Sequence, residues 1–139
     1  MLRCLKHISA TFHDLRESDH TRNGMALSTD LDVAELFHSL SKCEPFMFEL
    51  KHVGGYTLTV GYGGELGFAQ YAATDGEPPY LVTVAQHSGD GEPVTTFLVG
   101  NELTEIPLRF CLPIALIENT AAEFVKTGAR SSKVKWEEI

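Results

Sequence analysis

Residues 46–64 read FMFELKHVGGYTLTVGYGG, and this stretch decides the fold that the sequence predicts. Apolar and polar residues alternate on both sides of Gly54-Gly55, and Gly63-Gly64 ends the second run. Alternation with a period of two is typical of a strand with one buried face, and a glycine pair between two such runs is typical of a hairpin. The stretch therefore predicts two antiparallel strands joined by a two-residue turn.

The same pattern continues outward from this hairpin. Strand-like runs follow at 66–72, 80–86 and 94–99, separated by turn-forming residues at 75–79, 88–91 and 100–101. Weaker strand patterns lie at 2–12 and 134–139, and residues 13–24 have the composition of a loop. Regularly recurring turn signals of this kind predict an antiparallel meander of about five or six strands.

Two segments have the 3.6-residue period of a helix. Thr29 and Asp32 have the spacing of a capping box, and apolar residues recur at helical spacing over 30–41. A second apolar stripe runs over 113–126, with Pro113 at its first turn and Gly128 at its end. We therefore expect an α+β fold with two main helices packed on one face of the sheet.

The length of the chain, 139 residues, is typical of a single domain, so we expect one domain over 1–139. Residues 1–23 read partly as a loop and have no assigned role. Trp136, the single tryptophan, is expected to pack on the core and hold the C-terminal end in place. Strand alternation points Glu137 away from Trp136, toward solvent.

The acidity of the chain is concentrated in its middle. The net charge is −8, yet residues 52–108 contain no Lys or Arg, where an even spread would place about four or five. Seven acids lie there: Glu65, Asp75, Glu77, Asp90, Glu92, Glu102 and Glu105. This segment is either a solvated face that favours solubility or a surface complementary to a basic partner.

Several classes of function are disfavoured by composition. An acidic domain does not favour binding to nucleic-acid backbones, which requires clustered Lys and Arg. No apolar run approaches the length of a membrane helix, and the N-terminal residues lack the apolar stretch of a signal peptide. Three widely spaced cysteines are typical of reduced thiols. We expect a cytoplasmic protein that binds neither nucleic acid nor membrane.

No motif points to catalysis by this chain. The six histidines match no metal-ligand spacing, so no metal or cofactor is expected. The glycine-rich run 61–67 lies between two predicted strands and lacks the Lys-Ser/Thr of a phosphate-binding loop, which favours a hairpin or bulge. Cys111 precedes a helix start, where a thiol pKa can fall, but a buried structural cysteine is the stronger interpretation. We expect no catalytic residues and a binding module rather than an enzyme.

The order and spacing of several stretches resemble one family. Residues 58–68 resemble its central hairpin and residues 75–80 its next turn. Four further stretches resemble its second helix and terminal Trp-Glu signature: Ile106-Pro107, Glu123-Phe124, Thr127-Gly128-Ala129-Arg130 and Trp136-Glu137-Glu138. On these residues the chain resembles the Imm-one immunity proteins of bacterial polymorphic-toxin systems. The stretch up to about residue 23 carries no resemblance.

This resemblance implies a cytosolic antitoxin. Members of the family are encoded beside toxins, often with a nucleic-acid deaminase domain, and protect the producing cell. The implied partner is a basic toxin domain, and a deaminase's zinc and catalytic residues would belong to that partner. Two other classes remain open: a small enzyme or ligand-binding domain whose site is not visible in the sequence, and a structural or self-associating domain.

The predicted meander divides the acidic turns between two ends of the sheet. Successive turns of a meander lie at opposite ends, so the turns at 54–55 and 73–78 are expected to share one end and those at 62–65 and 88–93 the other. The second end has more acids and two glycine-rich turns. We therefore expect the partner to contact Glu65, Asp90 and Glu92, with Asp75 and Glu77 as the alternative group.

Overall fold

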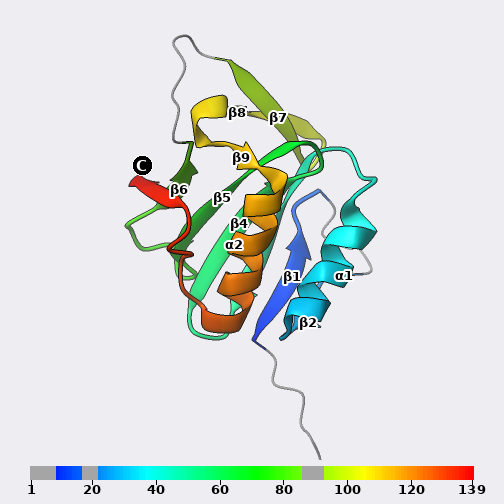
Figure 1. Ribbon diagram of the computed structural model, residues 1–139, viewed down its shortest axis with the longest axis vertical. Helices are drawn as coiled ribbons and strands as arrows, with labels where there is room; N and C mark the ends of the chain where they lie inside the picture. The colour runs from blue at the N-terminus through cyan, green and yellow to red at the C-terminus, as the bar shows by residue number, and fades with distance from the viewer. Residues whose placement is uncertain (1–8, 17–21, 86–92) are drawn as a thin grey trace, which may run out of the picture.

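The computed structural model describes residues 9–16, 22–85 and 93–139, and it is an α+β fold with two helices on a mostly antiparallel sheet (Figure 1). The fold class predicted from the sequence is confirmed. The sheet has ten strands, more than the five or six expected, because the two weaker patterns near the chain ends both form strands and the segments 25–27, 102–107 and 112–113 also pair. The strands are β1 (Ala10–Asp14), β2 (Met25–Leu27), β3 (Phe46–His52), β4 (Tyr56–Tyr62), β5 (Leu66–Ala73), β6 (Leu81–Val84), β7 (Val94–Val99), β8 (Glu102–Pro107), β9 (Leu112–Pro113) and β10 (Lys135–Glu138).

The predicted meander is present from β3 to β6, which lie side by side in chain order. All three pairings between these strands are antiparallel, with Leu50 opposite Leu58 in the first hairpin. The turn of that hairpin spans 53–55, so the predicted two-residue turn is one residue too short. Gly55 alone takes a positive φ there, +100°, and a longer loop with one such residue is a common hairpin form.

The expectation that the strand at 94–99 continues the meander is wrong. β7 pairs with β8 and meets β3 only at Phe46 and Leu98, in parallel, while β10 takes the place beside β6. Alternation shows that a segment is a strand but not which edge it joins. Phe97 packs in the smaller core on the side of the sheet away from the helices, where its ring lies 5.3 Å from that of Phe68.

The start of the chain also differs from the expected strand at 2–12. β1 begins at Ala10 and lies between β3 and β2, so part of the predicted 13–24 loop is strand. Residues 1–8 and 17–21 lie outside the described part of the chain.

Both helices are confirmed to within one or two residues. Helix α1 spans Asp30–Leu40 and begins with the predicted capping box, in which the Asp32 N–H donates to Thr29 Oγ1 at 3.1 Å and the Asp32 carboxylate accepts from the Thr29 N–H at 3.1 Å. Helix α2 spans Ile114–Thr127 and ends at Gly128 in the left-handed conformation. A short 3-10 helix, Leu108–Phe110, precedes β9. No helix in the described ranges is long and apolar enough to cross a membrane.

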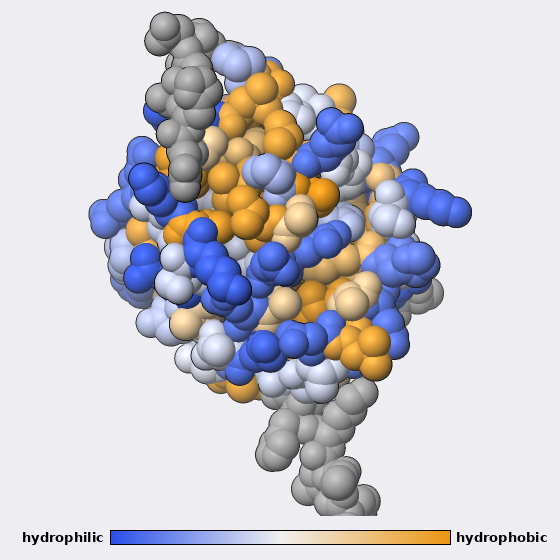
Figure 2. All heavy atoms as spheres, viewed as in Figure 1, coloured by the Kyte–Doolittle hydropathy of each residue, from blue (hydrophilic) through white to orange (hydrophobic). Residues whose placement is uncertain are grey.

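The two faces of the sheet are covered differently. Both helices lie on one face (Figure 1), and their apolar stripes meet the sheet in a core that includes Phe12, Phe48, Leu58, Ile117 and Phe124. On the other face a smaller core of Met47, Phe68, Val82, Phe97 and Cys111 lies beneath the β7–β8 hairpin. Hydrophilic side chains run along the exposed sides of the helices in Figure 2. The helix-covered face therefore places two sets of polar groups next to the main core, and these form the two grooves described below.

Candidate functional site

The predicted contact residues that the structure describes lie at two opposite ends of the sheet, as the meander predicted. Glu65 is exposed in the loop between β4 and β5, and Asp75 and Glu77 are exposed in the loop between β5 and β6, at the opposite end. The Thr74 N–H donates to the Gly55 carbonyl at 2.9 Å, so the two turns expected to share an end do meet. Asp90 and Glu92 lie outside the described residues, so the Glu65 group is placed by one member only.

Glu65 lies beside the start of α2. Its carbonyl accepts the Ile114 N–H at 2.9 Å, and Leu66, which follows it, is 37% exposed. Hydrophobic residues gather over β9 and the start of α2 in the upper half of Figure 2. Glu65 is thus an acid at the edge of an apolar patch, but no groove forms there among the described residues.

A groove of about 560 Å³ opens beside the 74–80 loop, and we call it the aromatic groove. It lies between the open ends of β4 and β5, the 74–80 loop and the segment that follows α2. Its main lining residues are Tyr56, Tyr71, Glu77, Pro78, Arg130 and Trp136. Of the sequence-predicted contact residues, only Glu77 lines it, with Asp75 two residues away in the same loop.

Stacked aromatic rings form the floor of the aromatic groove. The Tyr56 and Tyr71 rings stack with centroids 4.9 Å apart and an angle of 13°. Trp136 meets Tyr71 edge-on at 6.3 Å, and the Arg130 guanidinium lies 5.7 Å from the Tyr71 ring centre. Stacking and cation–π contacts of this kind each add to the energy of simple burial.

Hydrogen bonds hold these rings in place. The Trp136 indole Nε1–H donates to the Ser131 carbonyl at 3.0 Å, and the Tyr71 hydroxyl donates to the Gly128 carbonyl at 3.0 Å. Burial, followed by the Tyr56 phenol, raises the pKa of Tyr71, and Arg130 partly opposes this. Tyr71 therefore stays protonated near neutral pH and keeps donating this hydrogen bond.

Two carboxylates at the aromatic groove have no ion pair among the described residues. The Glu77 carboxylate is exposed and forms no hydrogen bond or ion pair within the described ranges, and the same is true of Glu138. Glu77 is nevertheless held by its backbone, because its N–H donates to Asp75 Oδ1 at 3.0 Å. The Tyr80 hydroxyl also donates to the Gly76 carbonyl and braces this loop.

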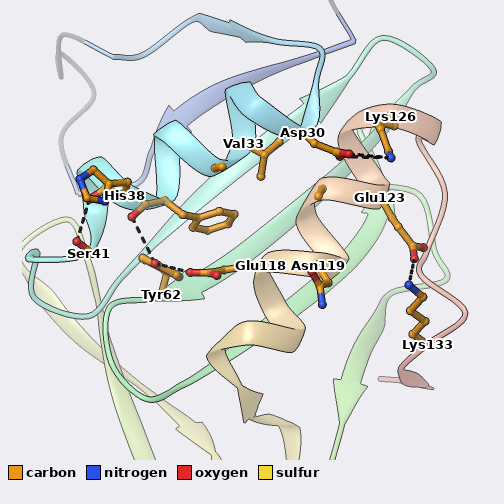
Figure 3. Close-up of a pocket in the computed structure, with 13 residues that line it drawn as sticks. Asp30, Val33, His38, Ser41, Tyr62, Glu118, Asn119, Glu123, Lys126 and Lys133 are labelled. Carbon is orange, nitrogen blue, oxygen red and sulfur yellow. Dashed lines mark hydrogen bonds and ion pairs between the residues drawn. The ribbon is translucent and has the colours of Figure 1, made fainter.

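A second groove, of about 640 Å³, lies between α1 and α2 (Figure 3), and we call it the interhelical groove. At its floor the Tyr62 hydroxyl donates to Glu118 Oε2 at 2.8 Å and lies 3.4 Å from the Phe37 carbonyl. Burial and the hydrogen bond to Glu118 raise the pKa of Tyr62 far above its usual value. This phenol is a permanent donor rather than an acid that reacts near neutral pH.

The remaining charges of the interhelical groove are paired across it. Lys126 lies 3.3 Å from the Asp30 carboxylate, and Lys133 lies 3.9 Å from the Glu123 carboxylate, as the dashed lines in Figure 3 mark. His38 also lines this groove. The three carboxylates that line this groove, Asp30, Glu118 and Glu123, are thus all engaged by this chain itself.

The described residues offer few groups arranged for chemistry. Burial raises the pKa of the Cys111 thiol to about 11, and its Sγ donates to the Pro107 carbonyl at 3.7 Å, so it is a structural cysteine. A hydroxyl–imidazole contact joins Thr11 Oγ1 to His13 Nε2 at 2.8 Å, but these residues line neither groove. Across residues 9–16, 22–85 and 93–139, no three His, Cys, Asp or Glu side chains gather as metal ligands.

Comparison with protein families agrees with the resemblance drawn from the sequence. A family model described as Immunity protein Imm1 matches residues 21–138. The chain belongs to the Imm1 immunity protein family. No curated protein matches the chain. The Imm1 match includes both helices, β2 to β10 and both grooves, and β1 lies before it.

Sequence reasoning missed most of the aromatic groove. Tyr56, Tyr71 and Arg130 were not among the predicted site residues, and Trp136 was expected to serve the core alone. Trp136 does pack partly buried against that core, and Glu137 is exposed, but Trp136 also lines the groove. A signal existed at Tyr56, a large aromatic residue placed directly after a glycine turn, where one end of a strand is open to solvent.

Proposed function

We propose that this chain binds a cognate toxin and neutralises it in the cytosol of the bacterium that produces both. The observation that carries the proposal is the Imm1 family match over residues 21–138. The structure supports a binding role because the aromatic groove presents an exposed tyrosine ring and a carboxylate that has no ion pair among the described residues. Among those residues, the thiol and phenols with raised pKa values are held in their protonated forms.

The finer part of the proposal is that the toxin is a nucleic-acid deaminase. Such an enzyme binds phosphates in a basic cleft and activates water on its own zinc ion. The segment without Lys or Arg, 52–108, offers carboxylates that match such a cleft, and Glu65, Asp75, Glu77, Glu102 and Glu105 are all exposed. In this proposal the chain blocks the cleft, the zinc belongs to the toxin, and the chain itself holds no cofactor.

The contact residues remain those predicted from the sequence, Glu65, Asp90 and Glu92, with Asp75 and Glu77 as the alternative group. Opposite charges steer association and raise its rate by about 10–10³-fold, which matters for an inhibitor that must act as soon as toxin is present. Charges at the rim of an interface mainly change the association rate, whereas desolvated ones change dissociation.

The test is co-expression with the toxin gene encoded beside this chain. We expect cells that make the toxin to survive when they also make the chain, and the two purified proteins to form a complex that weakens with salt. Loss of deamination in the presence of the chain would assign the toxin's chemistry. Equal killing with and without the chain, and no complex in low salt, would contradict the function.

Charge reversal separates the two acidic groups. Replacing Glu65, Asp90 and Glu92 together with Lys tests the first group, and the same reversal of Asp75 and Glu77 tests the alternative. The group that contacts the toxin is the one whose reversal weakens the complex and flattens its salt dependence. If neither set changes the affinity or the salt slope, an acidic contact surface is wrong and the interface is apolar or formed by the backbone.

A further inference from the structure

We propose that the aromatic groove and the free edge of β10 together form the docking site for an extended, basic segment of the toxin. This inference rests on the proposed immunity function and adds to it the surface used and the chemistry recognised. It favours the end of the sheet with Asp75 and Glu77 over the end with Glu65.

The backbone of β10 offers unpaired groups at the edge of the sheet. Within the described chain β10 pairs with β6 alone, in antiparallel register with Trp136 opposite Thr83. The Ile139 N–H donates to the Tyr80 carbonyl at 2.9 Å, so every second residue back from Ile139 bonds to β6. The N–H and C=O groups of Trp136 and Glu138 therefore point outward, which is the arrangement that a partner strand extends.

The side chains beside this edge are acidic. Strand alternation places Glu138 on the same face as Trp136, which lines the groove. Glu77 also lines the groove and has no ion pair among the described residues, and Asp75 lies in the same loop. The groove lining itself holds one carboxylate, Glu77, and one cation, Arg130, and Glu138 and Asp75 add two carboxylates beside it. A strand laid along β10 would place alternate side chains over the groove, and charge complementarity favours Lys or Arg there.

The stacked tyrosines provide a surface for such a cation. Tyr56 is 41% exposed although its ring is stacked on Tyr71, so one aromatic face remains open to a partner. The Arg130 guanidinium already lies 5.7 Å from the Tyr71 ring centre, which shows that this floor accepts a planar cation. A partner cation over Tyr56 is also within the neighbourhood of the Glu77 carboxylate, since both residues line the same groove.

The groove is formed before any partner binds. The two hydrogen bonds that anchor Trp136 and Tyr71 fix both rings, and Tyr80 braces the loop that carries Glu77. A preformed site loses little conformational entropy on binding, and aromatic and Arg residues in such pockets supply much of the energy of protein interfaces. The interhelical groove offers no free carboxylate to a partner, because its carboxylates contact its own lysines and Tyr62.

The experiment measures affinity for the toxin domain encoded beside this chain, purified in a catalytically inactive form. Glu138→Pro removes an N–H that points away from β6 and leaves the β6 pairing intact, so it blocks strand addition; Glu138→Ala is its control for lost charge. Tyr56→Ala removes the open ring. Glu77→Lys is matched by Glu35→Lys, an equal charge change at an exposed site on α1 that lies outside 52–108 and lines neither groove.

We expect Glu138→Pro to weaken binding by about 10-fold or more relative to Glu138→Ala, and Tyr56→Ala to weaken it by about 10-fold. Glu77→Lys is expected to weaken binding by about 10-fold relative to Glu35→Lys and to reduce the salt dependence. Thermal melting of each variant, within a few degrees of the parent, shows that the fold is kept.

Each outcome decides the proposal. If the parent binds the toxin and all three groove variants bind like their controls, the docking site is overturned while the immunity function stands. If Tyr56→Ala and Glu77→Lys weaken binding but Glu138→Pro does not, the strand-addition mode is wrong. If the parent neither binds nor protects, the immunity function fails first, and the docking site fails with it.

Discussion

The interhelical groove and the aromatic groove have similar volumes, about 640 and 560 Å³, but opposite electrostatic character. In the interhelical groove Asp30, Glu118 and Glu123 each contact a donor from this chain. In the aromatic groove Glu77 is left unpaired among the described residues beside an open tyrosine ring. The contacts within the interhelical groove join the two helices to each other. The aromatic groove, with an unpaired carboxylate and an exposed ring, has groups available to bind a partner.

This contrast separates stability from binding. Substitutions in the interhelical groove are expected to lower the free energy of unfolding and leave toxin affinity unchanged. Substitutions at the rim of the aromatic groove are expected to lower toxin affinity and leave the free energy of unfolding unchanged. Trp136 belongs to both classes, because it lines the aromatic groove and also packs on the main core, as Tyr71 and Val134 do.

The largest effect is expected for Trp136→Ala. Truncation of a large aromatic residue in a core lowers the free energy of unfolding by about 3–5 kcal/mol, and Trp136 is partly buried, so we expect a loss near the lower limit, about 3 kcal/mol. Urea unfolding followed by circular dichroism measures it. Trp136→Phe keeps the ring and is expected to recover most of the stability. A Trp136→Ala protein that unfolds like the parent would show that this residue serves the groove alone.

Much of this fold follows from local signals in the sequence. The period-two runs on either side of Gly54-Gly55 predict β3 and β4, and the Thr29–Asp32 spacing predicts the capped start of α1. These signals act over a few residues, so they do not depend on the rest of the chain. The position of β7 involves a contact between residues far apart in sequence, Phe97 and Phe68. The residues next to either one in the sequence do not predict this contact.

The candidate site was less predictable for the same reason. The acidic turns are visible as composition, and the meander correctly placed Glu65 apart from Asp75 and Glu77. The aromatic groove is assembled from Tyr56, Tyr71 and Trp136, three residues on three strands, and from Arg130 after α2. The β4–β5 hairpin brings the two tyrosines together, but Trp136 joins them through the pairing of β10 with β6, whose residues are far apart in sequence.

A smaller loss of stability is expected for Tyr62→Phe at the floor of the interhelical groove. The change removes a buried hydroxyl that donates to Glu118 at 2.8 Å, and a hydrogen bond to a charged group contributes about 1.5–3 kcal/mol. We expect a loss of about 2 kcal/mol in the free energy of unfolding, with unchanged affinity for the toxin. Titration calorimetry against the toxin provides the second measurement. Weakened binding without lost stability would place the interface between the helices and reverse the contrast drawn above.

The Tyr62 phenol also gives the chain a dependence on alkaline pH. Its pKa is raised in the folded state by burial and by Glu118, so folding favours the protonated form. The stabilisation is therefore fully present below the unfolded value of about 10 and is lost as the pH rises above it, by at most about 1.4 kcal/mol per pH unit. Unfolding in urea at pH 9, 10 and 11 measures this slope. Tyr71 and Cys111 also have raised pKa values, so the informative quantity is the difference from Tyr62→Phe, which should fall less steeply.

The smallest effect is expected for the ion pair between Lys126 and Asp30, which closes one end of the interhelical groove. Their charged groups are 3.3 Å apart, but the side chains are 48% and 68% exposed. Exposed pairs typically contribute about 0.2–1 kcal/mol, since water and salt screen the attraction and both side chains lose conformational freedom. A double-mutant cycle with Lys126→Met and Asp30→Asn is expected to give a coupling of less than about 0.5 kcal/mol, which disappears in 1 M salt. A larger coupling that survives salt would mean that the pair, rather than the apolar stripes beneath it, holds α1 against α2. In that case the internal pairing of charges in this groove would be a main source of stability, and not only the reason that the groove has nothing to offer a partner.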